Sequence, residues 1–427
     1  MSLKKVVIVG AKRTPIGSFM GSLSRTSVTT IGSKSIEAAI KSISLKPALI
    51  DEVYFGNVLQ AGVGQAPARQ AAIFADVPKN VPCTTINKVC SSGMKSISIA
   101  AQSIAVGENN VVVAGGMENM SMSPHYLNLR RGVKFSETKL NDVLEIDGLM
   151  DPFHNKLMGV YAEKTAEKFG ISRLEQDKYC KESYLKSQNA WKKGFFNNEI
   201  CEIKIKDSKG EEINFKKDEE CFNVNFDKIK SLKSPFLKNG TVTAANASSI
   251  NDGAAALILM SEKKAKELNL RPMAEIISYA DASNDPKRFT TAPSKVLPIA
   301  LKRANLDLSQ IDLLEINEAF SVVALVNLKI LGINPDIVNI NGGAVSLGHP
   351  LGCSGARIVV TLINALNQRN LKRGAAIICN GGGGASAIII ESKKNGLDEI
   401  YDPVTKCTPK TKQIFKIERH YGRNIVC

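Results

Sequence analysis

Short apolar segments rich in β-branched residues alternate along the chain with segments of helical spacing. Five of the apolar segments read KKVVIVG, NNVVVAGG, AALILM, AEIISYA and AAIICN. Continuous apolar runs of this length are typical of strands that are buried on both faces. Residues 28–43 have apolar side chains at helical spacing, and so do residues 321–332, which end at Gly332, a common helix terminator. The pattern predicts an α/β fold in which helices cover sheets.

One order of elements occurs twice. Residues 90–116 contain CSSGMKSISIAAQSI and then ENNVVVAGG, while residues 352–384 contain GCSGARIVVTLINAL and then KRGAAIICNGGGG. Each copy has a turn of small residues, a helix of about four turns and a strand that ends in glycine. The repeat predicts two duplicated α/β halves whose turns and strand ends face a common cleft.

The region between the two copies has a different character. Residues 121–249 mix irregular polar stretches with a helical segment, SRLEQDKYCKESYLKSQNAWKKG, which predicts an inserted loop lobe. After it, the apolar pattern resumes. We therefore expect an N-terminal half made of residues 1–120 and 250–271, the lobe at 121–249, a C-terminal half at 272–392, and a basic extension at 393–427 that lacks any period.

Length and composition narrow the class of protein. The chain of 427 residues exceeds the size at which one core stops growing, roughly 250–300 residues. Its hydrophobic fraction of 44% and charged fraction of 23% are typical of a folded globular protein. The apolar runs are shorter than the ~18 residues that a membrane span needs. Because the chain passes from two lysines straight into a strand pattern, we expect no targeting leader and a cytoplasmic protein.

The formal net charge of +15 is compatible with several partners. Nucleic acid, an acidic membrane and a phosphate-rich substrate all attract basic proteins, but a lysine-rich genomic composition gives the same charge without a partner. The lysines are dispersed and no nucleic-acid-binding motif accompanies them, so we expect no nucleic-acid partner. The nine cysteines are unevenly spaced and odd in number, which indicates reduced thiols.

Cys90 is the first candidate for chemistry. It lies in NKVCSSGMK, where a turn of small residues leads into a helix. Unpaired N–H groups and the helix dipole at a helix N-terminus favour a thiolate, so we expect a lowered thiol pKa and a nucleophile. The alternative is a buried and inert cysteine.

Two further candidates lie in glycine-rich segments, one just before the second copy and one near its end. His349, one of four histidines, lies in NGGAVSLGHPLGCSGAR, where the glycines allow a substrate to approach closely. A satisfied structural histidine is the alternative. Cys379 ends a strand and is followed by Asn380 and four glycines, whose N–H groups suit an oxyanion hole or a phosphate cradle. No GKS or GKT follows, so a P-loop has little support.

These segments, together with NEAF at residues 317–320, resemble the thiolase family, and the resemblance extends to about residue 391. GGMENMSMSPH and NGTVTAANASSINDGAAAL are most similar to acetoacetyl-CoA thiolases of the mitochondrial type. The resemblance implies a five-layer αβαβα fold made of the two halves, with CoA and subunit contacts in the lobe. It implies a dimer or tetramer and a reversible Claisen condensation of two acetyl-CoA to acetoacetyl-CoA and CoA through an acetyl-cysteine. No cofactor is required.

The same resemblance assigns roles to single residues. It implies that Cys90 is acylated, that His349 is the base and that Cys379 moves the α-proton of the second substrate. It also implies that the N–H groups of Cys90 and Gly381 form one oxyanion hole and that Asn317 holds a water for the other. The residues implied for the pantetheine and acyl groups are Ser248, Met158, Leu157, Phe320 and Phe289. Those implied for a potassium ion are Tyr184, Ala244, Ala245, Ala247 and Val345.

One departure from the family pattern leaves alternatives open. Leu157, Met158 and Gly159 stand where biosynthetic thiolases have His-Met-Gly. A 3-ketoacyl-CoA thiolase for longer chains is therefore an alternative, and a non-catalytic acyl-CoA-binding protein is another. A decarboxylating ketosynthase is disfavoured, because such enzymes do not need a second catalytic cysteine.

Overall fold

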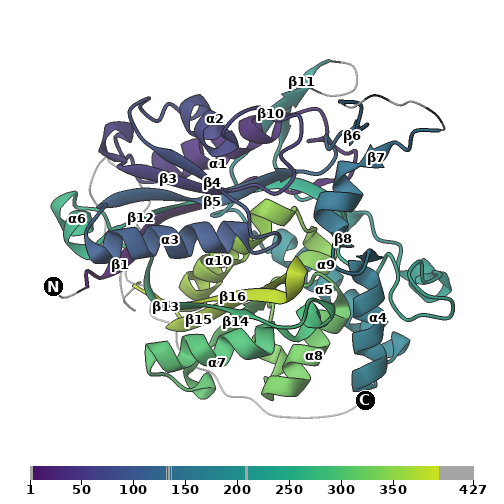
Figure 1. Cartoon of the computed structure of the whole chain (residues 1–427). Helices are drawn as coiled ribbons and strands as arrows, with labels where there is room; N and C mark the ends of the chain where they lie inside the picture. Colours follow the sequence, from purple (N-terminus) through teal and green to yellow (C-terminus); the bar gives the residue numbers. More distant parts are fainter. Residues whose placement is uncertain (1–2, 131, 133–134, 136, 207–209, 394–427) are drawn as a thin grey trace, which may run out of the picture. The chain divides into compact units, whose positions relative to one another are not determined.

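The strands form two sheet layers with helices between and outside them (Figure 1). The structure is a computed structural model that describes residues 3–130, 132, 135, 137–206 and 210–393. The first layer has the order β1-β12-β5-β3-β4 and the second β14-β15-β16-β13. Their bounds are β1 Val6–Arg13, β12 Asn251–Ser261, β5 Val111–Asn119, β3 Glu52–Gly56, β4 Cys83–Ile86, β14 Leu313–Ile316, β15 Arg373–Asn380, β16 Gly384–Ser392 and β13 Ala274–Ser283.

A short pairing of β1 with β13 joins the two layers, where Val7 lies opposite Glu275 and Ile8 opposite Ala274. The short strand β2 (Gly17–Ser18) pairs with β12 and completes a sheet of ten strands. Every residue of β5 and of β12 is buried. This explains why these strands have continuous apolar runs instead of an alternating pattern.

The helices make three further layers. In Figure 1, α1 and α2 cover the outer face of the first sheet layer, α3 and α10 lie between the layers, and α7 and α8 cover the second. The expected five-layer αβαβα thiolase-like arrangement is thus confirmed. The helices are α1 Val28–Ser42, α2 Pro67–Phe74, α3 Ser92–Val106, α4 Met158–Phe169, α5 Arg173–Lys192, α6 Glu262–Glu267, α7 Pro293–Ala304, α8 Ser321–Leu331, α9 Ala344–Leu347 and α10 Leu351–Arg369.

The predicted helices and the repeat are present. The segment 28–43 forms α1, and 321–332 forms α8, which ends at Gly332 in the left-handed conformation (φ 63°). The repeated segments form α3 followed by β5 and α10 followed by β15. Both central helices start with small residues because they pack closely: a Cβ added to Gly93 would lie 2.8 Å from the backbone of α10. The duplicated order therefore places two equivalent helix starts in the middle layer.

The segment between β5 and β12 is richer in structure than the sequence predicted. The helical segment noted there forms α5, but α4 precedes it. Three hairpins accompany them: β6 His125–Tyr126 with β7 Asn141–Asp142, β8 Met150–Asp151 with β9 Lys156–Leu157, and β10 Ile203–Lys206 with β11 Glu212–Phe215. Along the described chain as a whole, short segments of 3-10 or π-helix are η1 Pro47–Leu49, η2 Leu144–Leu149, η3 Glu220–Phe222, η4 Phe226–Ser231, η5 Pro286–Thr291, η6 Leu308–Gln310, η7 Pro335–Ile337 and η8 Gly381–Gly383.

The halves and the intervening segment pack as one compact unit, so the predicted domain boundaries stay a prediction. Of the predicted basic extension, only Lys393 lies within the described residues. No helix in the described part of the chain has both the length and the apolar character for crossing a membrane.

A buried ion cluster ties the first sheet layer to the segment before β12. Arg13 ends β1 with no exposed surface, and its Nε lies 2.6 Å from Glu199 while its two terminal nitrogens lie 2.7 and 3.0 Å from Asp218. The Trp191 indole also donates to Asp218 at 3.1 Å. Burying charges is tolerated here because the guanidinium pairs with both carboxylates.

Arg13→Met is expected to destabilise the protein by about 3–5 kcal/mol, because it leaves two buried carboxylates without their cation. Urea unfolding measures the change in the free energy of unfolding. The matched control is Lys41→Met, which removes an ion pair with Glu37 on the solvent face of α1 and is expected to have no measurable effect. Equal effects of the two substitutions would contradict a structural role for the buried cluster.

Candidate active site

A pocket of about 490 Å³ collects most of the residues that the sequence singled out. Its lining is largely apolar. The predicted residues in the lining are Cys90, His349, Gly381, Ser248, Leu157, Met158, Phe289, Phe320, Ala244 and Ala247. Segments from both halves and from the region between them therefore meet around one cavity.

Several lining residues were not predicted. They include Phe19, Val89, Met120, Leu149, Phe236, Ile250 and Leu351. Phe236 packs edge-on against Phe320, with ring centroids 6.2 Å apart, and a Cβ added to Gly159 would meet its ring at 2.4 Å. Residue 159 is therefore glycine because a larger side chain would clash with the Phe236 ring.

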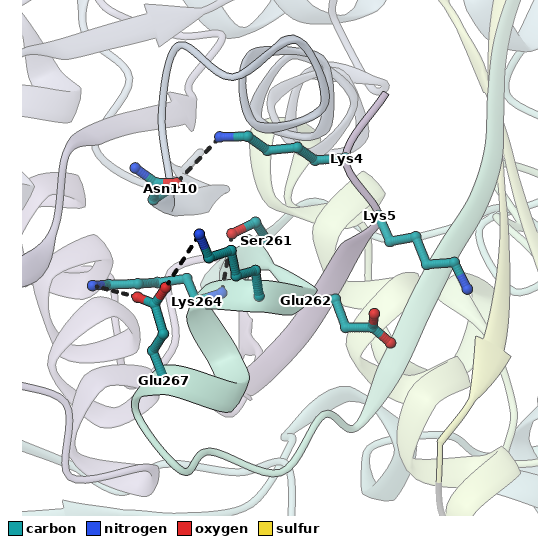
Figure 2. A pocket seen from close by; sticks show the side chains of 8 residues that line it. Lys4, Lys5, Asn110, Ser261, Glu262, Lys264 and Glu267 are labelled. Carbon is teal, nitrogen blue, oxygen red and sulfur yellow. Dashed lines mark hydrogen bonds and ion pairs between the residues drawn. The ribbon is translucent and has the colours of Figure 1, made fainter. Parts of the chain in front are cut away.

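A second pocket, of about 450 Å³, lies at the surface near the start of β1 and α6 (Figure 2). Charged and polar side chains line it, and some of them interact with each other. Lys4 donates to Asn110 at 3.4 Å, and Lys264 forms an ion pair with Glu267 at 3.2 Å. It contains none of the predicted site residues. The chemistry therefore belongs to the apolar pocket.

Cys90 lies directly before α3, as predicted. The helix begins at Ser92, and the backbone N–H groups of Gly381 and of Cys90 itself point at the sulfur. These groups lower the pKa of the thiol, but burial in the apolar pocket outweighs them and raises the pKa to about 11. The expectation of a lowered thiol pKa is wrong, because the sequence shows the helix start but not the desolvation. The resting thiol is protonated and needs a base.

His349 lines the same pocket and has the protonation state that such a base requires. Its imidazole is buried, and burial followed by the nearby Arg357 guanidinium lowers its pKa to about 3, so the ring is neutral near pH 7. The Ser354 hydroxyl lies 2.6 Å from Nδ1 and donates to the Pro350 carbonyl at 2.8 Å. Since that hydroxyl proton is already used, Ser354 accepts from Nδ1–H, and Nε2 carries no proton and can accept one.

Asn317 and Cys379 come from the ends of adjacent strands. Asn317 follows β14 and Cys379 lies near the end of β15, and these strands are parallel, so both ends lie at one edge of the sheet. Asn317 Nδ2 lies 3.5 Å from His349 Nε2, and its Oδ1 has no partner among the described residues. This free acceptor suits a water or a substrate group.

Cys379 is almost completely buried and packs in one cluster with Phe289 and Phe320. Burial raises the pKa of its thiol well above the usual value, and the nearby Cys90 raises it further. A thiolate formed there is a strong base, as removal of a proton from carbon requires. The structure thus brings both thiols, the imidazole, the Asn317 amide and the Gly381 N–H together.

Glu318 of NEAF has a supporting position that the sequence did not reveal. Its buried carboxylate accepts four hydrogen bonds of 2.7–3.0 Å, from Tyr179, Ser183, Asn339 and the Val345 N–H. The Val345 contact fixes α9, which leads directly into the His349 loop. Glu318 therefore helps to fix the segment that carries His349, although Glu318 itself does not line the pocket.

Profiles of known families match almost the whole described chain. The thiolase N-terminal domain matches residues 6–263, and the thiolase C-terminal domain matches residues 270–392. The chain belongs to the thiolase family. The prediction made from the four sequence segments is confirmed.

Individual relatives cover this thiolase nearly end to end. The cytosolic acetyl-CoA acetyltransferase of Gibberella zeae is 51% identical over 92% of this chain and 99% of its own. The mitochondrial acetyl-CoA acetyltransferase of Bos taurus is 51% identical over 91% of this chain and 92% of its own. The crystal structure of Acat5 thiolase from Ascaris suum with coenzyme A matches with a TM-score of 0.86 at 46% identity, covering 91% of this chain and 100% of that one.

A thiolase of different printed specificity has the same fold. Human mitochondrial 3-ketoacyl-CoA thiolase matches with a TM-score of 0.89 at 38% identity, covering 92% of this chain and 100% of that one. Fold alone therefore does not separate short-chain from longer-chain thiolases.

Residues expected to contact the pantetheine arm line the pocket of this thiolase. The Ser248 hydroxyl donates to the Ala319 carbonyl at 2.9 Å, and Phe289 packs against Phe320 with centroids 6.4 Å apart. Met158 starts α4 and packs in the same cluster. Their part in CoA binding stays a prediction.

The five residues expected for potassium lie on neighbouring elements. Tyr184 and Val345 are buried in one cluster, against which Ala245 packs, while Ala244 and Ala247 line the pocket. A tyrosine hydroxyl and backbone carbonyls form an all-oxygen donor set, which fits a hard cation. One of these carbonyls, that of Ala245, already accepts from the Cys180 thiol at 2.9 Å. The potassium site stays a prediction.

Proposed function

We propose that this thiolase is an acetyl-CoA C-acetyltransferase, which joins two acetyl-CoA molecules into acetoacetyl-CoA and CoA and also catalyses the reverse cleavage. The observation that carries the proposal is that Cys90 and His349 line one pocket while Cys379 lies buried close to Cys90, in one cluster with the pocket residues Phe289 and Phe320. Relatives that are named acetyl-CoA acetyltransferases, at about half identity over nine tenths of the chain, support the short substrate.

In the first half-reaction, His349 Nε2 takes the Cys90 proton as the sulfur attacks the thioester carbonyl of acetyl-CoA. The N–H groups of Cys90 and Gly381 stabilise the oxyanion. The C–S bond to CoA then breaks, and Cys379 gives its proton to the departing thiolate. The enzyme now holds an acetyl group on Cys90 and a thiolate at Cys379.

In the second half-reaction, the Cys379 thiolate takes an α-proton from a second acetyl-CoA. The enolate oxygen is stabilised by the protonated His349 and by a water held on Asn317. The enolate carbon attacks acetyl-Cys90, a C–C bond forms, and the Cys90 sulfur leaves and regains its proton from His349. Both cysteines end protonated, so the cycle closes.

The test of function compares two substrates. Purified enzyme with CoA is expected to cleave acetoacetyl-CoA with a kcat/KM at least about 10-fold above that for 3-ketohexanoyl-CoA, since extra methylenes in a pocket change kcat/KM by roughly 10–200-fold each. Loss of the enolate absorbance follows the reaction. Faster cleavage of the longer substrate would instead support a 3-ketoacyl-CoA thiolase. No cleavage of either, with both thiols intact, would support a binding protein.

We infer a homo-oligomer, a dimer or tetramer, with acetyl-CoA, acetoacetyl-CoA and CoA as its small-molecule partners and no required cofactor. Potassium binding stays a separate prediction. The cytoplasmic location expected from the sequence stays a prediction. Relatives named for the cytosol and for the mitochondrion are equally similar, at 51% identity, so they do not choose between compartments.

A further inference from the structure

The turn that presents Cys90 is strained. Val89, which precedes the nucleophile, has a φ of 48°. A β-branched residue with a left-handed backbone is an outlier that costs free energy and persists only where the surroundings hold it. Some interaction near this residue must therefore offset the strain.

Lys88, the residue before Val89, contacts residues that are far away along the chain. The Lys88 ammonium forms an ion pair with Asp281 and donates to the Ser386 hydroxyl at 2.9 Å. Ser386 in turn donates to Asp281 at 2.6 Å, and Lys95 of α3 lies 2.7 Å from the other carboxylate oxygen. We call these four residues the Lys88 cluster. Its ionic side chains are 25–37% exposed, so water screens them only in part.

The cluster is fixed on strands that carry the other half of the site. Asp281 on β13 lies opposite Ser386 on β16, and Ser386 lies opposite Ile378 on β15, directly before Cys379. Lys88 thus ties the Cys90 turn to the strands that lead to Cys379 and Gly381. The hydrogen bond of Ser91 to Asn380, 3.0 Å long, makes a second tie on the other side of the nucleophile.

We propose that Lys88 is a positioning residue, whose ion pair with Asp281 and hydrogen bond to Ser386 hold Val89 in its left-handed conformation. This keeps the Cys90 sulfur under the Gly381 N–H, so that the two halves of the oxyanion hole stay aligned. The inference rests on the proposed function for its kinetic readout. Lys88 is absent from the lining of the pocket, so its role does not require contact with the substrate.

The experiment compares Lys88→Met with Lys95→Met. Each substitution removes one cation from the same carboxylate, but only Lys88 lies in the strained turn. Lys88→Met is expected to lower kcat for acetoacetyl-CoA cleavage by about 10–100-fold, as misplacement of a reacting atom by about 1 Å does, with KM changed less than about threefold. It should slow alkylation of Cys90 by iodoacetamide. Lys95→Met should leave both rates within about twofold.

A double-mutant cycle tests the strain itself. Glycine adopts a positive φ without penalty, so the loss caused by Lys88→Met should be smaller in a Val89→Gly background than beside Val89. The conservative Lys88→Arg should retain most of kcat. If Lys88→Met does not fold, Ser386→Ala, which removes one partner of the ammonium, should lower kcat in the same direction.

The inference is overturned if the two lysine substitutions have equal effects, if Val89→Gly leaves the Lys88 loss unchanged, or if Ser386→Ala leaves kcat unchanged. An inactive wild-type enzyme would overturn the proposed function instead. The alkylation rates of Cys90 in the variants would still decide whether Lys88 positions the thiol.

Discussion

Cys90→Ser is expected to lower kcat for acetoacetyl-CoA cleavage by about 10³-fold or more, because removing the nucleophile of a covalent mechanism leaves only binding and the oxyanion hole. A serine hydroxyl is a far weaker acid than a thiol, and the buried pocket that already raises the pKa of the Cys90 thiol to about 11 disfavours an alkoxide even more. His349 therefore cannot activate it to a comparable degree. Steady-state thiolysis measures the loss.

A mass measurement distinguishes loss of chemistry from loss of structure. After incubation with acetyl-CoA, the wild-type chain should gain one acetyl group and Cys90→Ser should gain none. Cys83→Ser, on the edge strand β4 outside the pocket, is the matched control and should retain both the adduct and turnover within about twofold of wild type. An acetyl adduct on the Cys90→Ser protein at another residue would show that Cys90 is not the nucleophile.

The sequence predicted the fold well because burial on both faces leaves a strong local signal. β5 and β12 contain continuous apolar runs because both strands are buried along their whole length, and the repeat of helix and strand marked the two halves. α4 was missed. It follows an irregular stretch and its first residue, Met158, belongs to the pocket, so the sequence around it was interpreted as part of a loop.

The candidate site was predictable where residues are chemically unusual for their surroundings. Cys90, His349 and Cys379 each lie within three residues of a glycine, which local sequence reveals. Phe236 and Leu351 were not predictable as pocket residues, because an apolar side chain in a cavity has the same local pattern as one in a core. The Lys88–Asp281 pair spans 193 positions and leaves no local signal. Desolvation of Cys90 likewise depends on side chains that only the fold assembles.

Cys379→Ser is expected to separate the two half-reactions. Removing this thiol should lower condensation and thiolysis by about 10²–10⁴-fold, the contribution typical of a general acid–base group. Acetylation of Cys90 should survive, since that step uses His349 as its base and needs Cys379 only to protonate departing CoA, which is a good leaving group. The variant should therefore accumulate acetyl-Cys90 when it is mixed with acetyl-CoA.

Intact mass and turnover, measured on one preparation, test this separation. The combination of a full acetyl adduct with a deep loss of turnover places Cys379 at the proton of the second substrate. Cys90→Ser is the reference that loses both, and the thermal midpoint shows whether the buried serine unfolds the protein, because the Cys379 side chain is only 1% exposed. Should Cys379→Ser fold normally but also fail to become acetylated, the proton that Cys379 gives to departing CoA would be essential to the first half-reaction, and the expected separation of the two half-reactions would be wrong.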